Sequence, residues 1–275
     1  MRKLHAVIVA TALSLGGIAA AEPVTVRYPE GTVRGFLVLR GLDDKILAEG
    51  EAIQTATGDR VTAKLVFRFR DGSLQEESTV YSQRDRFKLI SGRLVQKGPT
   101  FPQPLEMTID GNTGNVNVSY QEKGQQKTAT ERMTVPDDLA NGMVSKLLMN
   151  ARPDAMPASF SLIAATPTPR MVKLMVMPAG RGQFSIGGAA RQANHYVLKV
   201  EIGGVAGVIA PLIGKQPPDS HVWILGGDVP AFVRSEQPLY AGGPMVRIEL
   251  TSPVWPKTQT PPTAKADTTK RKAPG

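Results

Sequence analysis

The chain has 275 residues, a formal net charge of +9 and no cysteine. With 41% hydrophobic and 21% charged residues, its composition is that of a globular protein and not of a disordered or collagen-like one. The absence of cysteine excludes disulfides, thiolate metal sites, a cysteine nucleophile and the cysteine that anchors a lipoprotein. The length allows one large domain or two small ones.

The first 21 residues have the pattern of a secretory signal peptide. Two basic residues begin it, an apolar stretch follows, and Ala19 and Ala21 suit a cleavage site before Glu22. We therefore expect residues 1–21 to be removed on export, which places the mature protein in a periplasm or outside the cell. No later segment reaches the roughly 20 apolar residues of a membrane-spanning helix, so no transmembrane span is expected.

Residues 257–275 contain no large apolar side chain and are predicted to be a disordered basic tail. Without the signal and this tail, residues 22–256 hold 26 basic and 23 acidic residues, a net charge of +3. A protein that binds nucleic acid usually concentrates its basic residues on one face, whereas here both signs are interleaved. The sequence thus predicts a single domain over residues 22–256 that does not bind nucleic acid.

Alternation with a period of two dominates the first half of this domain. In residues 61–69 the odd positions are Val, Ala, Leu, Phe and Phe, which is typical of a strand with one buried face. Asp71-Gly72 follows, a strong hairpin signal. Similar strands and short turns run from residue 35 to residue 135, and short connections make neighbouring strands antiparallel. Because long strands in one twisted sheet curl, we expect a strongly curved antiparallel sheet, either a half-barrel or an open barrel.

One helix is predicted at about residues 136–150. Pro136 suits its first turn, and the two aspartates that follow suit the positive end of the helix dipole. Leu139, Met143 and Leu147 share one face at helical spacing. Gly142, inside this segment, suggests close packing of the helix on the sheet. The chain after the helix returns to strands, so the fold class is mainly β with one packed helix.

No catalytic motif with known mechanics is present, neither a GxSxG elbow nor HExxH, a P-loop or GxGxxG before a helix. His195 and His221 are the histidines of the predicted domain, too few for a metal site without carboxylates, so no metal or other cofactor is predicted. Asp219, Ser220 and His221 leave a hydrolase open as an alternative. The sequence favours a binding protein over an enzyme.

The segment of residues 202–213 is apolar, carries three glycines and a proline, and contains no charge. It can be read either as a packed strand and loop or as the apolar mouth of a ligand site. Under the second reading, the concave face of the sheet and this mouth supply the candidate ligand-binding residues. They are Phe36, Leu65, Phe67, Phe69, Val208, Ile209, Leu212, Ile213 and Trp223.

The meander from Asp59 to Gly98, with the run Arg68-Phe-Arg-Asp-Gly72 inside it, resembles exported bacterial proteins of unknown function. The single helix after the meander and the late strand at 195–201 share this resemblance. Those proteins are similar to the half-barrel families of periplasmic lipoprotein carriers. The resemblance implies a curved antiparallel sheet around an apolar cavity, closed by helix and loops, and the binding of a lipid-like ligand. It implies no catalytic residue.

Together these observations predict a soluble envelope protein that binds an apolar or amphipathic ligand, or the acyl group of a lipoprotein, in a concave sheet. The alternatives are an envelope module that contacts another envelope protein and has no cavity, and the hydrolase named above.

Overall fold

Fourteen antiparallel strands form one continuous sheet in the computed structural model, which describes residues 23–152, 156, 158–186, 188–201 and 217–251. The first eight strands are β1 (Val33–Gly41), β2 (Ile46–Thr57), β3 (Arg60–Phe69), β4 (Leu74–Ser82), β5 (Lys88–Lys97), β6 (Leu105–Asp110), β7 (Asn115–Glu122) and β8 (Gln125–Arg132). After the helix α1 (Val144–Asn150) come β9 (Ala158–Ala164), β10 (Arg170–Ile186), β11 (Ala189–Glu201), β12 (Ser220–Leu225), β13 (Ala231–Pro238) and β14 (Met245–Thr251). The mainly β prediction is confirmed.

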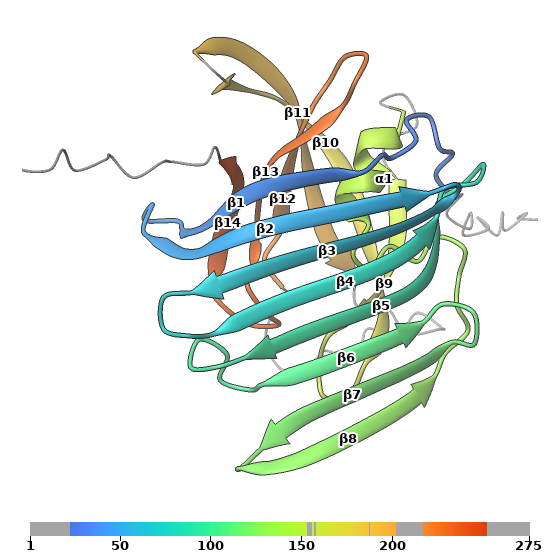
Figure 1. The fold of residues 1–275 in the computed structure, drawn as a ribbon, viewed down its shortest axis with the longest axis vertical. Coiled ribbons are helices and arrows are strands. Elements are labelled where there is room, and N and C mark those ends of the chain that lie inside the picture. The colour runs from blue at the N-terminus through green and yellow to red at the C-terminus, as the bar shows by residue number, and fades with distance from the viewer. Residues whose placement is uncertain (1–22, 153–155, 157, 187, 202–216, 252–275) are drawn as a thin grey trace, which may run out of the picture.

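The order of the strands shows how the two halves of the chain meet. From β1 the chain winds outward by hairpins to β8 at one edge, crosses to β9 at the other edge, and returns to β14 beside β1 (Figure 1). The pairing of Leu39 with Ile248 joins the two meanders at the centre of the sheet. The predicted signal peptide, residues 1–21, and the predicted tail, residues 257–275, lie outside the described residues.

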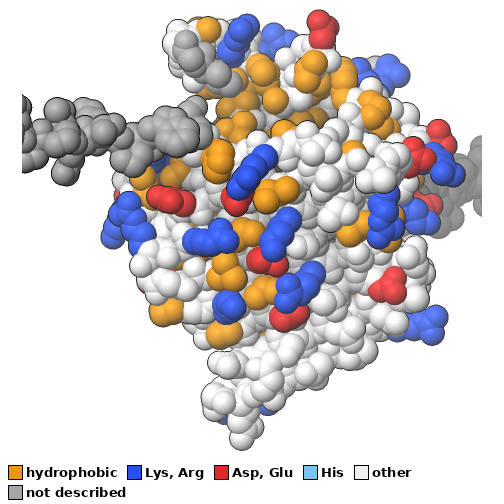
Figure 2. All heavy atoms as spheres, in the orientation of Figure 1, with side chains coloured by type: hydrophobic (Ala, Val, Ile, Leu, Met, Phe, Trp, Pro, Cys, Tyr) orange, Lys and Arg blue, Asp and Glu red, His pale blue; other side chains and the backbone are white. Residues whose placement is uncertain are grey.

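Alternating apolar side chains give the sheet an inner, concave face. In β6, for example, Leu105, Met107 and Ile109 are buried while the residues between them are half-buried. The predicted hairpin at Asp71-Gly72 is present, with Gly72 at a φ of 84°, a value that glycine adopts without strain. The outer face of the part of the sheet formed by β1–β8 instead carries basic and acidic side chains next to one another, with apolar side chains between them (Figure 2).

Two hydrophobic clusters fill the inner face. The first contains side chains from β3–β7 and from β9–β12 together with Leu139, Met143, Leu147 and Leu148, so the sheet curls until its two halves share one core around α1. The second contains side chains of β1–β3 and β14 together with Phe101 and Leu239. Its aromatic centre is the edge-to-face pair of Phe69 and Phe101, whose ring centroids are 5.5 Å apart.

The free edge of β9 is covered by the segment of residues 138–141. The backbone of Asp138 accepts a hydrogen bond from Ser161 N at 3.2 Å, and Ala140 N donates to the Ser161 carbonyl at 2.8 Å. The Asn141 carboxamide then accepts from Ile163 N and donates to the Ile163 carbonyl, both at 2.9 Å. A side chain thereby continues the pairing that a strand would provide.

This pairing corrects the predicted helix of about residues 136–150, because α1 spans only Val144–Asn150. The backbone of residues 138–140 bonds to β9 instead of forming helical turns, and Gly142 has a φ of 69°, outside the helical region. Asp138 binds the Ser161 hydroxyl and the Lys173 ammonium and does not serve a helix dipole. The three residues of the predicted apolar face, Leu139, Met143 and Leu147, are all buried, although only Leu147 lies in α1.

Gly142 also packs closely on β4, as its sequence position suggested. A methyl group added there would overlap the Thr79 hydroxyl, whereas Gly124, also at positive φ, has open space around it. We expect Gly124→Ala to destabilise the fold by about 1–2 kcal/mol through its backbone conformation alone. Gly142→Ala should lower the free energy of unfolding by about 1–3 kcal/mol more than Gly124→Ala does, because Thr79 must move. Urea unfolding of both variants measures the difference; equal losses would contradict the close packing.

Candidate ligand site on the concave face

The two clusters leave a partly open strip across the inner face. The strand register aligns Ala52 of β2, Leu65 of β3, Glu77 of β4 and Leu94 of β5 in one row. All four are half-buried, while the next residue in the row, Met107 of β6, is buried. Ala52 and Leu65 pack against the second cluster and still remain partly exposed, so this row is a part of the concave face that the cores do not cover completely.

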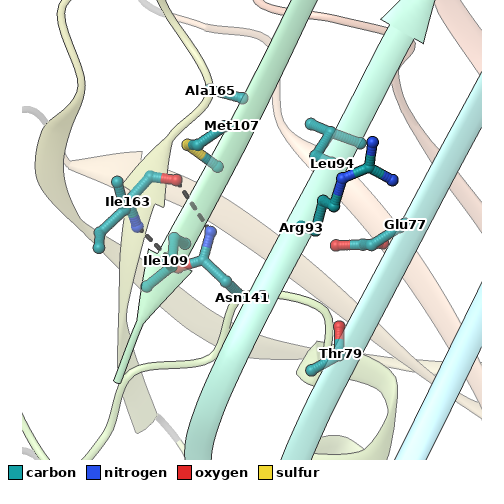
Figure 3. A pocket seen from close by; sticks show the side chains of 10 residues that line it. Glu77, Thr79, Arg93, Leu94, Met107, Ile109, Asn141, Ile163 and Ala165 are labelled. Atoms are coloured by element: carbon teal, nitrogen blue, oxygen red, sulfur yellow. Dashed lines mark hydrogen bonds between the residues drawn. The ribbon is translucent and has the colours of Figure 1, made fainter. Parts of the chain in front are cut away.

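A cavity of about 70 Å³ opens beside this row (Figure 3). Its walls come from β4, β5 and β6 on one side and from residue 141 and the end of β9 on the other. The lining residues are Glu77, Thr79, Gly92, Arg93, Leu94, Met107, Ile109, Asn141, Ile163 and Ala165. Aliphatic and thioether side chains dominate the walls, so the cavity suits an apolar group with a small polar part.

Glu77 is the acidic side chain at this cavity, and within the described part of the chain no hydrogen-bond donor or cation pairs with it. Its neighbour Glu76 points to the outer face and is paired twice, with Lys64 at 2.9 Å and Arg93 at 3.4 Å. The two adjacent glutamates therefore differ sharply in environment. Glu76 belongs to a surface ion-pair network, whereas Glu77 has no partner among the described residues and faces a mostly apolar wall.

Burial raises the pKa of the Glu77 carboxyl, because the charged form loses water without gaining a partner. A carboxyl group with a raised pKa in a cleft is a common mark of a functional site. Figure 3 shows the carboxyl group on β4 beside Arg93 and Leu94 of β5. The guanidinium of Arg93 is already bound by Glu106 at 2.8 Å and by Glu76.

Three of the predicted ligand residues lie on the concave face: Leu65, Phe67 and Phe69. Leu65 belongs to the open row, whereas Phe67 and Phe69 are buried in the second cluster. Phe36 is placed differently from the prediction. The register sets its neighbour Leu37 beside Gly50 and Phe67 on the inner face, so Phe36 points to the outer face, where it is 40% exposed.

Trp223 also lies on the outer face, because Val222 and Ile224 on either side of it are buried in the first cluster. Its ring stacks on His195 at a centroid distance of 4.4 Å, and the Arg234 guanidinium lies 5.7 Å from the ring centroid. Trp223 therefore does not line the concave face. Val208, Ile209, Leu212 and Ile213 lie outside the described residues.

His195 and His221 form a hydrogen-bonded pair, with His195 Nε2 3.0 Å from His221 Nδ1. Burial, and secondarily His221, lower the pKa of His195. A second cavity of about 150 Å³ adjoins His195. It is a surface hollow, since Pro178, Gly180 and Arg181 in its wall are exposed.

The hydrolase alternative requires Asp219, Ser220 and His221 to act together. Asp219 pairs with Lys199 at 3.6 Å and His221 with His195. Ser220 begins β12 next to His221, and alternation along a strand turns neighbouring side chains to opposite faces. The three residues thus do not form a triad. In the described segments no group of three or more His, Asp or Glu side chains could hold a metal ion.

Comparison with known proteins yields one structural likeness. The chain is similar to a β-barrel-like protein of a domain of unknown function, DUF1849, from Brucella abortus, with a TM-score of 0.44 and 12% sequence identity. The likeness covers 84% of this chain and 98% of that one. No family model and no curated protein matches the chain.

Over the ranges that the structure describes, no helix has the length and apolar character needed to cross a membrane.

The raised pKa of Glu77 leads to a prediction about stability. Folding a carboxyl whose pKa is raised above its unfolded value of 4.5 lowers the free energy of unfolding as the pH rises through that value. Glu77→Gln removes this effect, and we expect it to stabilise the protein by about 0.5–2 kcal/mol at pH 7. The gain should vanish at about pH 3, where the glutamate is protonated in both states.

Urea unfolding at both pH values measures this gain, and Glu76→Gln is the matched control. Glu76 is ion-paired, so its replacement should give no gain at neutral pH. A loss of stability in Glu77→Gln at neutral pH would show that the carboxylate is satisfied in the folded protein.

Proposed function

We propose that this protein is an exported binding protein that holds an amphipathic, lipid-like ligand, or the acyl group of a lipoprotein, on its concave face. The single observation that supports the proposal most strongly is the unpaired Glu77 carboxyl group beside an apolar cavity in the row between the two cores. A site with apolar walls and a few placed polar groups is the usual form of a small-molecule site.

The dimensions of the cavity restrict the proposal. An engineered protein cavity of about 150 Å³ holds benzene, so the 70 Å³ beside Glu77 would take only a few carbon atoms. The remainder of a longer ligand would lie along the half-buried row of Leu94, Leu65 and Ala52, which continues from the cavity across β5, β3 and β2. The ligand would therefore contact the sheet along its chain and enter the cavity with one end.

Octanol, a neutral amphiphile, tests this site directly in protein with isotope-labelled methyl groups. We expect saturable shifts of the methyl resonances of Met107, Ile109 and Ile163, which line the cavity. The methyl groups of Leu39 and Ile248 in the second cluster should stay unchanged. Solvent extraction of the purified protein followed by mass spectrometry would identify any lipid that it carries from the cell.

A matched pair of variants separates filling of the cavity from general effects on β5. Gly92 lines the cavity, and a Cβ atom there would meet Ile109 at 3.8 Å, an ordinary contact distance. Gly92→Leu should fill the space and weaken octanol binding by about tenfold or more, which corresponds to 1.4 kcal/mol. Ser91→Leu, one residue away on the outer face, should leave the affinity within about twofold. Equal affinities in all three proteins would contradict the proposed site.

The proposed export has its own test. Expressed with its own N-terminus in a bacterium with two membranes, the chain should be recovered from the periplasmic fraction with a mass that corresponds to cleavage between Ala21 and Glu22. Recovery of the uncleaved chain from the cytoplasm would contradict export.

A further inference from the structure

The chemistry around Glu77 restricts the class of ligand, on the assumption that the proposed binding function holds. The carboxyl group offers hydrogen-bond acceptors, and none of the described residues donates a hydrogen bond to it, although the Thr79 hydroxyl lines the same cavity. The Arg93 guanidinium is engaged by Glu76 and Glu106, and the Asn141 carboxamide is engaged by the backbone of Ile163. A ligand that satisfies the ionised form of this carboxyl group must therefore bring its own donor.

The covering loop limits the space for that donor. A Cβ atom built at Gly142 would lie 3.2 Å from Glu77 Oε1, so this residue approaches the carboxyl group from the side of residues 138–143. The Thr79 hydroxyl occupies the place that a side chain at this position would take, so this hydroxyl and the Glu77 carboxyl oxygen flank the same glycine. Leu94, Met107 and Ile163 form apolar walls of the same cavity.

The sign of the charge decides between classes of amphiphile. A carboxylate held in a mostly apolar site repels an anionic head group, and this repulsion acts against fatty acids. A neutral alcohol can donate one hydrogen bond. An ammonium group donates a charge-assisted bond, which is about twice as strong, and neutralises the unpaired charge. The combination of one lone carboxylate and apolar walls therefore fits an amphipathic cation best.

We propose that the concave site selects an amphipathic amine, whose ammonium group binds the Glu77 carboxylate beside Gly142 and whose apolar chain places a few of its carbon atoms in the cavity between β5, β6 and the end of β9. No covalent step is involved. Glu77 acts as the residue that determines specificity, while the apolar walls supply affinity for any short chain.

Three amphiphiles with the same chain length test this selection: octylammonium, octanol and octanoate, titrated by calorimetry into the full mature protein at pH 7. We expect the wild-type protein to bind octylammonium about tenfold or more tightly than octanol, with octanoate weakest. Glu77→Gln should abolish the preference of the amine over the alcohol and leave the affinity for octanol within about twofold. The matched control Glu76→Gln should behave as the wild-type protein does.

The outcomes separate this inference from the proposed function. If octanol binds and octylammonium has no advantage, or keeps its full advantage in Glu77→Gln, the amine selectivity is overturned while the apolar site stands. If octanoate binds most tightly, the role assigned to Glu77 is likewise overturned. If none of the three amphiphiles binds, the concave binding site fails, and the amine selectivity fails with it. Thermal unfolding curves of the variants verify that each compared protein is folded.

Discussion

The arrangement of the concave face depends on the hydrogen bonds that attach residues 138–141 to β9. An open sheet of fourteen strands has two edges, and an uncovered edge presents a row of unpaired backbone donors and acceptors. Asp138, Ala140 and the Asn141 carboxamide satisfy those of Ser161 and Ile163. The same bonds hold Gly142 against β4 and set Met143 into the first cluster, which determines both where α1 begins and where the cavity lies. The edge closure and the candidate site are thus parts of one local structure.

The edge of the sheet at β8 is protected by charge and not by a covering segment of the described residues. The residues of β8 are exposed along almost its whole length, and its inner face carries Lys127 and Glu131 opposite Tyr120 and Val116 of β7. Charged side chains that face inward oppose the addition of a further strand and stop the apolar core at β7. The backbone pairing of the sheet therefore ends in two ways, by coverage at β9 and by charge at β8.

The sequence was sufficient to predict the features that depend on local patterning. Alternation located the first meander and its hairpins, and the apolar face of the segment around Met143 was predicted correctly. The helix was predicted too long because its propensity signals could not show that the backbone of Asp138 and Ala140 would bond to a strand twenty residues later. Phe36 was assigned to the wrong face because residues 36–39 are all apolar, so alternation cannot determine which side chains point inward. Only the pairing of Leu37 with Gly50, and of Gly50 with Phe67, decides it.

Glu77 was not selected from the sequence, because strand pairing and not the local pattern determines where its side chain points. Along β4 the inner face carries Gln75, Glu77 and Thr79 before the buried Tyr81, whereas the outer face carries Leu74 and Val80, so the hydrophobic pattern alone does not decide the orientation of the strand. Pairing with Leu65 on β3 and Leu94 on β5 decides the orientation and turns the carboxyl group inward. A leucine at this position would join the two clusters into one continuous core and avoid the desolvation of a charge. An inward, unpaired carboxyl group therefore lowers the stability of the empty protein. A cationic ligand would pair with this carboxyl group and remove the cost of its desolvation. Removal of this cost would add to the affinity for the ligand.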